Sequence, residues 1–368
     1  MQIRAAILHE QGKPLSIESA DLGAPETGEV LVEVKASGVC HSDLHAINGD
    51  WPMRVPLCPG HEGAGIVRGV GPDVTRVREG DHVVLCWAPA CGRCAPCKAG
   101  TPLYCDRLDK VTYRNRLPFG GTRLRLGGQE VAPFLGTACF ATHTVVPESG
   151  VVAVPADVPF QALAAVGCAV VTGVGAVLNA AKVPAGATVA VIGAGGIGLN
   201  VVQGAALSGA ARIIAVDRQQ SPLQVAESLG ATDLVTAGEG TVQAIKDRTD
   251  GRGADFVFDT VGSPATLADA VAAARKGGTI VMTGLARYDT EAAIKTFPFV
   301  MQEKRLVGSV YGSFDPLQDI DRVVGFYRAG RLRLDELATR AYPLEGINDA
   351  LSALANGAGG RGVIFPSV

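Results

Sequence analysis

The stretch TVAVIGAGGIGLNVVQGAALS, Thr188 to Ser208, decides the fold of one of the two domains expected for this chain. An apolar strand over 188–192 leads into the turn GAGGIG, and 197–208 has the composition of a buried helix. In such a turn, Gly193 permits a tight bend, Gly195 lets the backbone approach a pyrophosphate, and Gly198 lets helix and strand pack closely. The stretch therefore predicts a strand, turn and helix that bind a dinucleotide, with Gly196 also in the turn.

Strand-like and helical runs continue to alternate after this stretch. Apolar runs predict strands at 212–217, 255–259 and 279–283, and 222–229 predicts a helix. This alternation is typical of a parallel sheet covered by crossover helices. We therefore expect the α/β class, with a Rossmann doubly wound parallel sheet at 170–309.

An acidic residue follows the turn at a fitting distance. Asp217 ends the strand IIAVD, nineteen residues after Gly198. A carboxylate there can accept hydrogen bonds from both hydroxyls of an adenosine ribose, and it repels a 2′-phosphate. NAD is therefore predicted over NADP, although Arg218 is a cation that could attract that phosphate.

Four cysteines lie within the fifteen residues CGRCAPCKAGTPLYC: Cys91, Cys94, Cys97 and Cys105. Four thiolates at this spacing can surround one structural Zn²⁺, with no position left for a substrate. An iron–sulfur cluster and a pair of disulfides are the alternatives. Zinc is favoured because neither a second cluster motif nor an export signal accompanies the four residues.

Composition limits the other classes of function. The chain has 368 residues, a net charge of −3 and nine cysteines, an odd number that favours a reducing compartment, so a cytoplasmic location is predicted. The small charge gives no general attraction to nucleic acid or to membranes.

Short Val- and Ile-rich runs predict an irregular β-rich domain at 1–169, a partly open barrel, to which 310–368 returns.

Two further motifs combine histidine with cysteine or glutamate. GVCHSDLH contains Cys40, and GHEGAG contains His61 and Glu62. Each motif alone is ambiguous, because a lone buried cysteine is usually inert packing. Beside a nicotinamide fold and a zinc cluster, a second and open metal site is the economical interpretation, since two cysteines and one histidine leave a fourth position for substrate.

The chain resembles the zinc-containing medium-chain alcohol dehydrogenases over essentially its whole length. The resemblance is carried by four segments that occur in the same order as in that family: GHEGAGIVRGVG, the four-cysteine segment, CAVVTGVG and GAGGIG. The resemblance implies that Cys40, His61 and Cys168 bind the catalytic zinc. The spacing of the cysteines alone could not have distinguished Cys168 from Cys58 or Cys139. The resemblance further implies that Asp43 orients His61, that Glu62 lies behind the metal, and that His41, Thr172, Ile197 and Arg361 contact the cofactor.

The resemblance also implies a mechanism. Zinc lowers the pKa of a bound alcohol, the proton leaves through Ser42 and the nicotinamide ribose to His45, and a hydride passes to nicotinamide. The implied function is the interconversion of alcohols and aldehydes by a homo-oligomer, with a dimer favoured over a tetramer.

The substrate pocket implied by the resemblance contains Trp51, Trp87, Phe134 and Leu285, which favours apolar or aromatic primary alcohols. The tryptophans could instead simply pack the domain. One alternative function is a thiol-dependent formaldehyde dehydrogenase, although HAINGD lacks the acidic pair of the glutathione-dependent form. A non-catalytic NAD-binding regulator is the alternative from another class.

Overall fold

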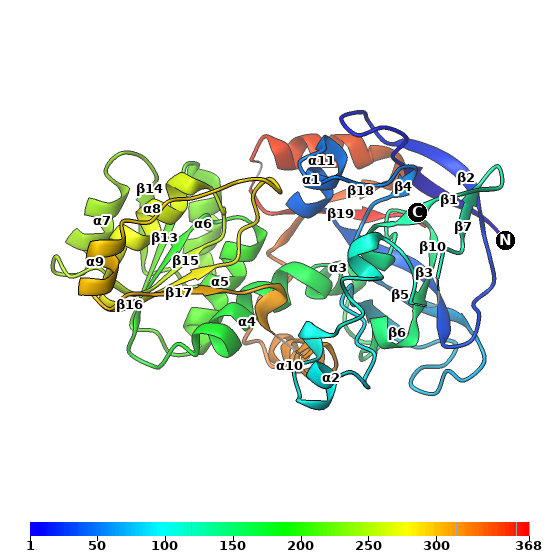
Figure 1. Ribbon diagram of the computed structural model, residues 1–368, viewed down its shortest axis with the longest axis horizontal. Coiled ribbons are helices and arrows are strands. Elements are labelled where there is room, and N and C mark those ends of the chain that lie inside the picture. Colours follow the sequence, from blue (N-terminus) through cyan, green and yellow to red (C-terminus); the bar gives the residue numbers. More distant parts are fainter. Residues whose placement is uncertain (119, 314, 358, 368) are drawn as a thin grey trace. The chain divides into compact units, whose positions relative to one another are not determined.

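The computed structural model describes residues 1–118, 120–313, 315–357 and 359–367, which form two compact units. Unit 1 comprises Met1–Cys168, Asp315–Asn356 and Arg361–Val368, and unit 2 comprises Ala169–Phe314 and Gly357–Gly360. In Figure 1, unit 1 combines the blue N-terminal end of the colour scale with the red C-terminal end. The tail therefore completes the fold of the first part of the chain.

Unit 1 is β-rich. Its largest sheet has the order β11-β6-β5-β3-β19-β18, and β10 also pairs with β3. A second sheet has the order β1-β2-β7-β8, and β4 pairs with β9. The strands are β1 (Gln2–Ile7), β2 (Ser16–Leu22), β3 (Glu29–Gly38), β4 (Leu57–Cys58), β5 (Glu62–Val70), β6 (His82–Leu85), β7 (Leu124–Leu126), β8 (Gln129–Glu130), β9 (Ala132–Pro133), β10 (His143–Pro147), β11 (Val151–Ala153), β18 (Ala338–Pro343) and β19 (Arg361–Phe365).

Alternating side chains explain the central strand of this unit. In β3, Val30, Val32 and Val34 are fully buried and pack in one cluster with Val67 of β5 and Val83 of β6. Successive side chains of a strand point to opposite faces, so the period of two directs these valines to one core. The sheet therefore forms a rigid base for the residues at the ends of β3, β5 and β19.

The α-helices that the structure describes in unit 1 are α1 (His41–Asn48), α2 (Ala95–Lys98), α3 (Phe160–Ala164), α10 (Pro316–Arg328) and α11 (Ile347–Ala355). Helix α1 buries Ala46 and Ile47 in a cluster with Ile347 and Leu351 of α11. The apolar face of α1 is thus fixed by the C-terminal part of the chain, which leaves its polar residues for the site.

Unit 2 confirms the predicted Rossmann fold. Its six parallel strands have the order β14-β13-β12-β15-β16-β17, with the glycine-rich turn after the central β12. They are β12 (Thr188–Ile192), β13 (Arg212–Asp217), β14 (Asp233–Thr236), β15 (Ala254–Asp259), β16 (Ala274–Met282) and β17 (Arg305–Gly308). The order runs outward in both directions from β12, as in a doubly wound sheet.

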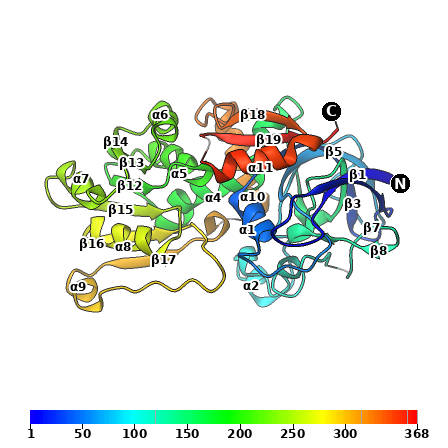
Figure 2. The same cartoon turned by 90° about the horizontal axis from the view of Figure 1, so that it is seen from above.

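The helices of unit 2 are α4 (Val171–Gly175), α5 (Gly196–Leu207), α6 (Gln220–Ser228), α7 (Thr241–Asp247), α8 (Pro264–Ala273) and α9 (Thr296–Met301). Contacts join α5 to α6 and α7 to α8, and both pairs pack against the sheet (Figure 2). Ala190 and Ile192 of β12 share one buried cluster with Leu267 and Ala270 of α8. Alternate residues of the buried strands thus pack on the α7–α8 side, as expected for crossover connections.

The chain was expected to return to the first domain at residue 310. In the structure it returns to unit 1 at Asp315, and Gly357–Gly360 belong to unit 2 again. Residues 311–313 belong to unit 2, where they pack closely on α4. A Cβ at Gly312 would lie 2.1 Å from the carbonyl oxygen of Val171, so only glycine allows this approach. Residues 357–360 also belong to unit 2, where a Cβ at Gly357 would lie 2.2 Å from Nε2 of Gln219. Across the described residues, no helix has the length and apolar character needed to cross a bilayer.

Candidate metal centres and nucleotide-binding turn

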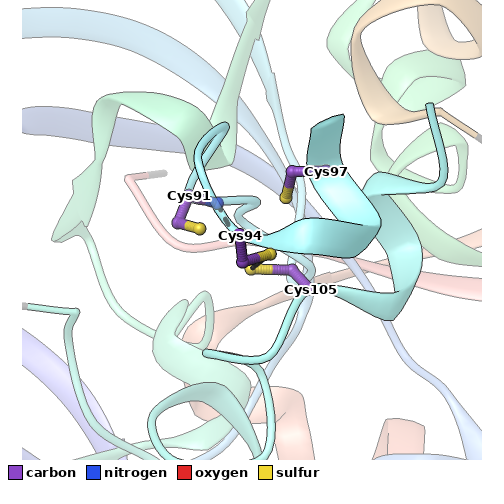
Figure 3. A group of neighbouring side chains, drawn as sticks. All are labelled: Cys91, Cys94, Cys97 and Cys105. Atoms are coloured by element: carbon purple, nitrogen blue, oxygen red, sulfur yellow. Dashed lines mark hydrogen bonds between the residues drawn. The ribbon is translucent and has the colours of Figure 1, made fainter. Parts of the chain in front are cut away.

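Four cysteines converge on one point in unit 1. The sulfur atoms of Cys91, Cys94, Cys97 and Cys105 all lie within 4.8 Å of one another (Figure 3). Helix α2 starts directly after Cys94 and contains Cys97, and the backbone N–H of Cys91 donates to Sγ of Cys105 at 3.3 Å. Two sulfurs bound tetrahedrally to Zn²⁺ at about 2.3 Å would be about 3.8 Å apart, and the Sγ atoms of Cys94 and Cys105 are separated by 3.8 Å. The four residues fit a single zinc ion.

The thiols of this set differ in acidity. Backbone N–H groups, that of Arg93 foremost, lower the pKa of Cys91 to about 6. Burial and the neighbouring sulfur of Cys94 raise the pKa of Cys97 to about 12. Crowded thiols resist losing their last protons because thiolates repel one another. A divalent cation between them would remove that repulsion, which is the chemistry that a structural zinc site provides.

A second set is assembled from distant segments of unit 1. Cys40 precedes α1, His61 precedes β5, Glu62 is the first residue of β5, and Cys168 ends the long first segment of the unit. One ligand atom from each of these four residues lies within 4.8 Å of the others, and all four residues are buried. Among the described residues, the structure thus brings Cys168, rather than Cys58 or Cys139, together with Cys40 and His61, and its role as a ligand stays a prediction.

Asp43 holds this second set together. Its Oδ1 accepts hydrogen bonds from Nδ1 of His61 at 3.1 Å and from the backbone of Gly60 at 3.0 Å, and its Oδ2 accepts one from the backbone of Cys40 at 3.1 Å. A carboxylate at Nδ1 leaves Nε2 as the nitrogen that can bind a metal. That Nε2 is buried and has no hydrogen-bond partner among the residues that the structure describes. A cation coordinated there would satisfy it, so the donor set fits a metal ion.

Close contacts shift the pKa values of the side chains in this set. Burial alone would lower the pKa of His61, but the charge and hydrogen bond of Asp43, together with those of Cys40, raise it. The thiol of Cys168 donates to Cys40, which holds the pKa of Cys40 well below its usual value and that of Cys168 well above it. Binding of a metal to two thiolates and a neutral imidazole would release the protons of these side chains.

A buried ion pair lies behind the second set. Arg361, at the start of β19, donates from Nε to Oε2 of Glu62 at 2.8 Å and from Nη2 to Oε1. Burial raises the pKa of Glu62 to about 7, although Arg361 opposes the rise. A Cβ at Gly38 would lie 2.2 Å from Oε2 of Glu62, so Gly38 provides the space for this carboxylate. The sequence did not reveal this ion pair or the role of Gly38; the contact of Arg361 with a pyrophosphate stays a prediction.

The predicted relay residues lie on α1. Ser42 is half-buried, and His41 of the same helix, which was predicted to contact the cofactor, is exposed. Nδ1 of His45 lies 2.8 Å from Oδ2 of Asp50, and Trp51 stacks on the imidazole with ring centres 5.0 Å apart. The pairing of His45 with Asp50 was also missed by sequence reasoning, which treated HAINGD only as a specificity segment.

The predicted pocket residues have different surroundings. Phe134 is fully buried and packs edge-on against the ring of His61 at 5.5 Å, and Trp87 is buried beside Tyr113. Leu285 lies in unit 2 and is 57% exposed. Thr172 lies in unit 2 too, buried in α4. The roles of Leu285 and Thr172 therefore stay predictions.

The glycine-rich turn of unit 2 has the geometry that its motif requires. Gly193 has a φ of +96°, and a Cβ at Gly198 would lie 1.8 Å from the carbonyl oxygen of Gly193. A Cβ at Gly195 would meet no atom within 4 Å, so this side of the turn is open to a ligand. Gly196 and Ile197 then begin α5, whose N-terminus attracts negative charge.

Asp217 lies beside this turn at the end of β13. Its Oδ2 accepts a hydrogen bond from the backbone of Ala194 at 2.8 Å, and its Oδ1 accepts one from Gln219 at 3.0 Å. Arg218 is exposed. The carboxylate is thus held next to the turn that would bind a pyrophosphate, which is where a ribose hydroxyl would meet it.

Comparison with known proteins assigns the family. Residues 26–156 match the alcohol dehydrogenase GroES-like domain, and residues 196–327 match the zinc-binding dehydrogenase family. The chain is 39% identical to the NDMA-dependent alcohol dehydrogenase of Amycolatopsis methanolica, over 100% of both chains. It is 36% identical to the S-(hydroxymethyl)glutathione dehydrogenase of Paracoccus denitrificans, over 99% of this chain and 100% of the relative.

A solved structure agrees with these relatives. The benzyl alcohol dehydrogenase of Acinetobacter calcoaceticus has a TM-score of 0.94, 33% identity and 100% coverage of both chains. The family implies a nicotinamide cofactor beside the two candidate zinc sites. The chain belongs to the zinc-binding medium-chain alcohol dehydrogenase family and is a zinc-dependent oxidoreductase of alcohols.

Proposed function

We propose that this enzyme interconverts primary alcohols that carry apolar or aromatic groups with the corresponding aldehydes, using NAD and a catalytic zinc ion. The observation that carries the proposal is the buried set Cys40, His61 and Cys168, in which Nε2 of His61 has no hydrogen-bond partner within the described part of the chain. Two cysteines and one histidine leave one position of a four-coordinate zinc for the substrate oxygen. Cys91, Cys94, Cys97 and Cys105 hold a second, structural zinc.

Bound zinc supplies a Lewis acid and bound NAD supplies a hydride acceptor. The chain's own residues handle the proton that the alcohol loses from its hydroxyl group. Ser42 accepts this proton and gives up its own hydroxyl proton, which His45 takes up and passes to water, because imidazole exchanges protons readily near neutral pH. Asp43 keeps His61 in the orientation and tautomer that a metal needs.

Aromatic side chains support the substrate class. Trp51, Trp87 and Phe134 belong to unit 1, and Phe134 contacts the ring of His61 directly. A flat apolar side chain beside a metal ligand, as Phe134 is, favours flat apolar substrates. The likeness to a benzyl alcohol dehydrogenase supports the same class.

Steady-state oxidation of benzyl alcohol and ethanol by the zinc-loaded enzyme, followed by absorbance of the reduced nicotinamide, tests the proposal. We expect kcat/KM to be at least about tenfold higher for benzyl alcohol, because burial of a ring contributes more than about 1.4 kcal/mol. A parallel assay contains NDMA, on which the Amycolatopsis relative is by its name dependent. An enzyme with two zincs per chain that oxidises neither alcohol in either assay would contradict the proposal.

A thiol-dependent formaldehyde dehydrogenase is the second candidate, supported by the likeness to an S-(hydroxymethyl)glutathione dehydrogenase. Formaldehyde oxidation with and without glutathione, and with other low-molecular-weight thiols, separates the two. We expect no acceleration by glutathione, because HAINGD lacks the acidic pair of the glutathione-dependent form.

The preference for NAD rests on Asp217. In an Asp217→Gly variant that retains Arg218, the ratio of kcat/KM for NAD to that for NADP should fall, since the carboxylate that repels a 2′-phosphate is removed. An Arg218→Gly variant is the matched control and should raise the ratio. An unchanged ratio in the Asp217 variant would show that Asp217 does not bind the ribose.

We also propose a homodimer in a cytoplasmic setting. Strand β17 lies at the edge of the sheet in unit 2, and large apolar side chains nearby are exposed: Phe297, Val300, Met301 and Leu306. An apolar edge strand is a template for pairing, and a twofold-related copy of β17 would extend the sheet. Mass measurement in solution should give a dimer, and Leu306→Lys should shift it towards monomer; a wild-type monomer would contradict the proposal.

A further inference from the structure

His45 is held on two sides by residues of the turn that follows α1. Nδ1 of His45 lies 2.8 Å from Oδ2 of Asp50, and the indole of Trp51 stacks on the imidazole at an interplanar angle of 25°. Both partners come from the turn because Gly49 ends the helix with a φ of +84° and reverses the chain. The His45 and Asp50 side chains are 20% and 23% exposed, so the contact is partly shielded from water.

Other contacts hold this turn in place. Nε2 of Gln11 donates to the carbonyl oxygen of Ala46 in α1 at 2.7 Å and to that of Trp51 at 2.8 Å. The backbone of Trp51 also donates to the carbonyl oxygen of His45 at 3.2 Å. Because one side chain joins the helix to the turn, the distance between His45 and Asp50 is set by the fold.

The contact has a chemical consequence for the imidazole. An ionised carboxylate only accepts hydrogen bonds, so Nδ1 must carry the hydrogen and Nε2 must carry the lone pair. A proton taken up at Nε2 then produces an imidazolium next to a carboxylate. Unit 1 uses the same arrangement at His61, where Asp43 engages Nδ1 and leaves Nε2 for a metal.

We propose that Asp50 is a positioning residue of the proton relay, which keeps His45 in the Nδ1-protonated tautomer so that Nε2 can accept the proton from the alcohol. The proposal rests on the proposed function, in which His45 carries that proton to water. The alternative is that Asp50 only fixes the turn, as Gln11 does.

A double-mutant cycle with Asp50→Asn and His45→Gln separates these roles. If Asp50 acts through His45, Asp50→Asn should lower kcat for alcohol oxidation about tenfold in the wild-type background and should have no effect in the His45→Gln background. Zinc content and the affinity for NAD should stay unchanged. The matched control is Glu18→Gln, which alters another carboxylate–histidine pair of unit 1, at His9, and should leave kcat unchanged.

The ring tautomer can be observed without any reaction. Long-range proton–nitrogen NMR spectra of the zinc-loaded protein, with nitrogen-15 in its six histidines, distinguish protonated from unprotonated ring nitrogens. The His45 signal should show protonated Nδ1 in the wild type and should shift towards the other tautomer in Asp50→Asn, where the amide can donate to Nδ1.

Three outcomes would overturn the proposal. An unchanged tautomer in Asp50→Asn, or losses of kcat that multiply in the double variant, would refute the role of Asp50 and leave the relay through His45 intact. Full activity of His45→Gln would refute the relay itself, and the role of Asp50 with it.

Discussion

The two metal-ligand sets of unit 1 are built in opposite ways. Cys91, Cys94, Cys97 and Cys105 come from one short segment, and the first three are partly exposed to solvent. The other set combines Cys40 before α1, His61 just before β5, Glu62 as the first residue of β5, and Cys168, and it includes or adjoins three buried charged residues: Asp43, Glu62 and Arg361. The hydrogen bonds between cysteines of the first set lie within its own segment, whereas Asp43 positions the second set from a buried place in α1. We therefore expect the first metal to stabilise the fold and the second to perform chemistry.

The largest loss of stability is expected when a cysteine of the first set is replaced. Cys94→Ser should lose one zinc and several kcal/mol of stability, with a fall in the thermal midpoint of roughly 10 °C or more, because a structural zinc contributes its binding energy to folding. Zinc analysis and a thermal unfolding curve measure both effects. Cys58→Ser, which alters a buried cysteine outside both sets, is the control and should keep all its zinc. A stable Cys94→Ser variant with unchanged zinc would show that the segment is not a metal site.

A smaller effect should follow from removing the charge behind the second set. Arg361→Met leaves the carboxylate of Glu62 buried without its partner, and breaking such a pair typically costs ~3–5 kcal/mol. The free energy of unfolding in denaturant measures this loss. Arg328→Met is the matched control, since Arg328 pairs with Asp157 at the surface, where an ion pair contributes ~0–1 kcal/mol. Equal losses in the two variants would show that the buried pair does not support the second set.

The smallest effect is expected from the carboxylate that orients His61. Asp43→Asn keeps the size of the side chain but places an amide where three N–H groups now donate. The affinity of the second set for zinc should fall ~10–100-fold, as is usual when the partner of a metal-bound histidine is lost. Competition with a chromogenic chelator measures the affinity. Asp50→Asn removes a carboxylate from a histidine that is no ligand, so its zinc affinity should match that of the wild type.

The difference between a site formed by one segment and a site formed by distant segments also explains how much of each could be predicted from the sequence. The four-cysteine segment and the strand, turn and helix around Gly193 to Gly198 are local, so spacing and periodicity were sufficient to predict them. The ends of β12 and β13 were predicted to the residue, whereas the short edge strands β14 and β17 were missed because few residues carry their pattern. The second metal set depends on residues brought together by the fold, and only the family resemblance identified Cys168.

Contacts made through folding were beyond the sequence. Arg361 and Glu62 meet because β19 and β5 both pair with β3, and Gly38 at the end of β3 leaves room for the carboxylate. Asp50 reaches His45 only because Gly49 adopts a left-handed conformation. Neither partnership has a spacing that distinguishes it from ordinary surface charges.

The most direct test of the two roles is the zinc content of a Cys168→Ser variant, measured beside the wild type. We predict two zincs per chain in the wild type and one in the variant, with the thermal midpoint within a few degrees of the wild type and alcohol oxidation lost. Two zincs in the variant, or one zinc together with full activity, would contradict the assignment of Cys40, His61 and Cys168 as the catalytic metal site.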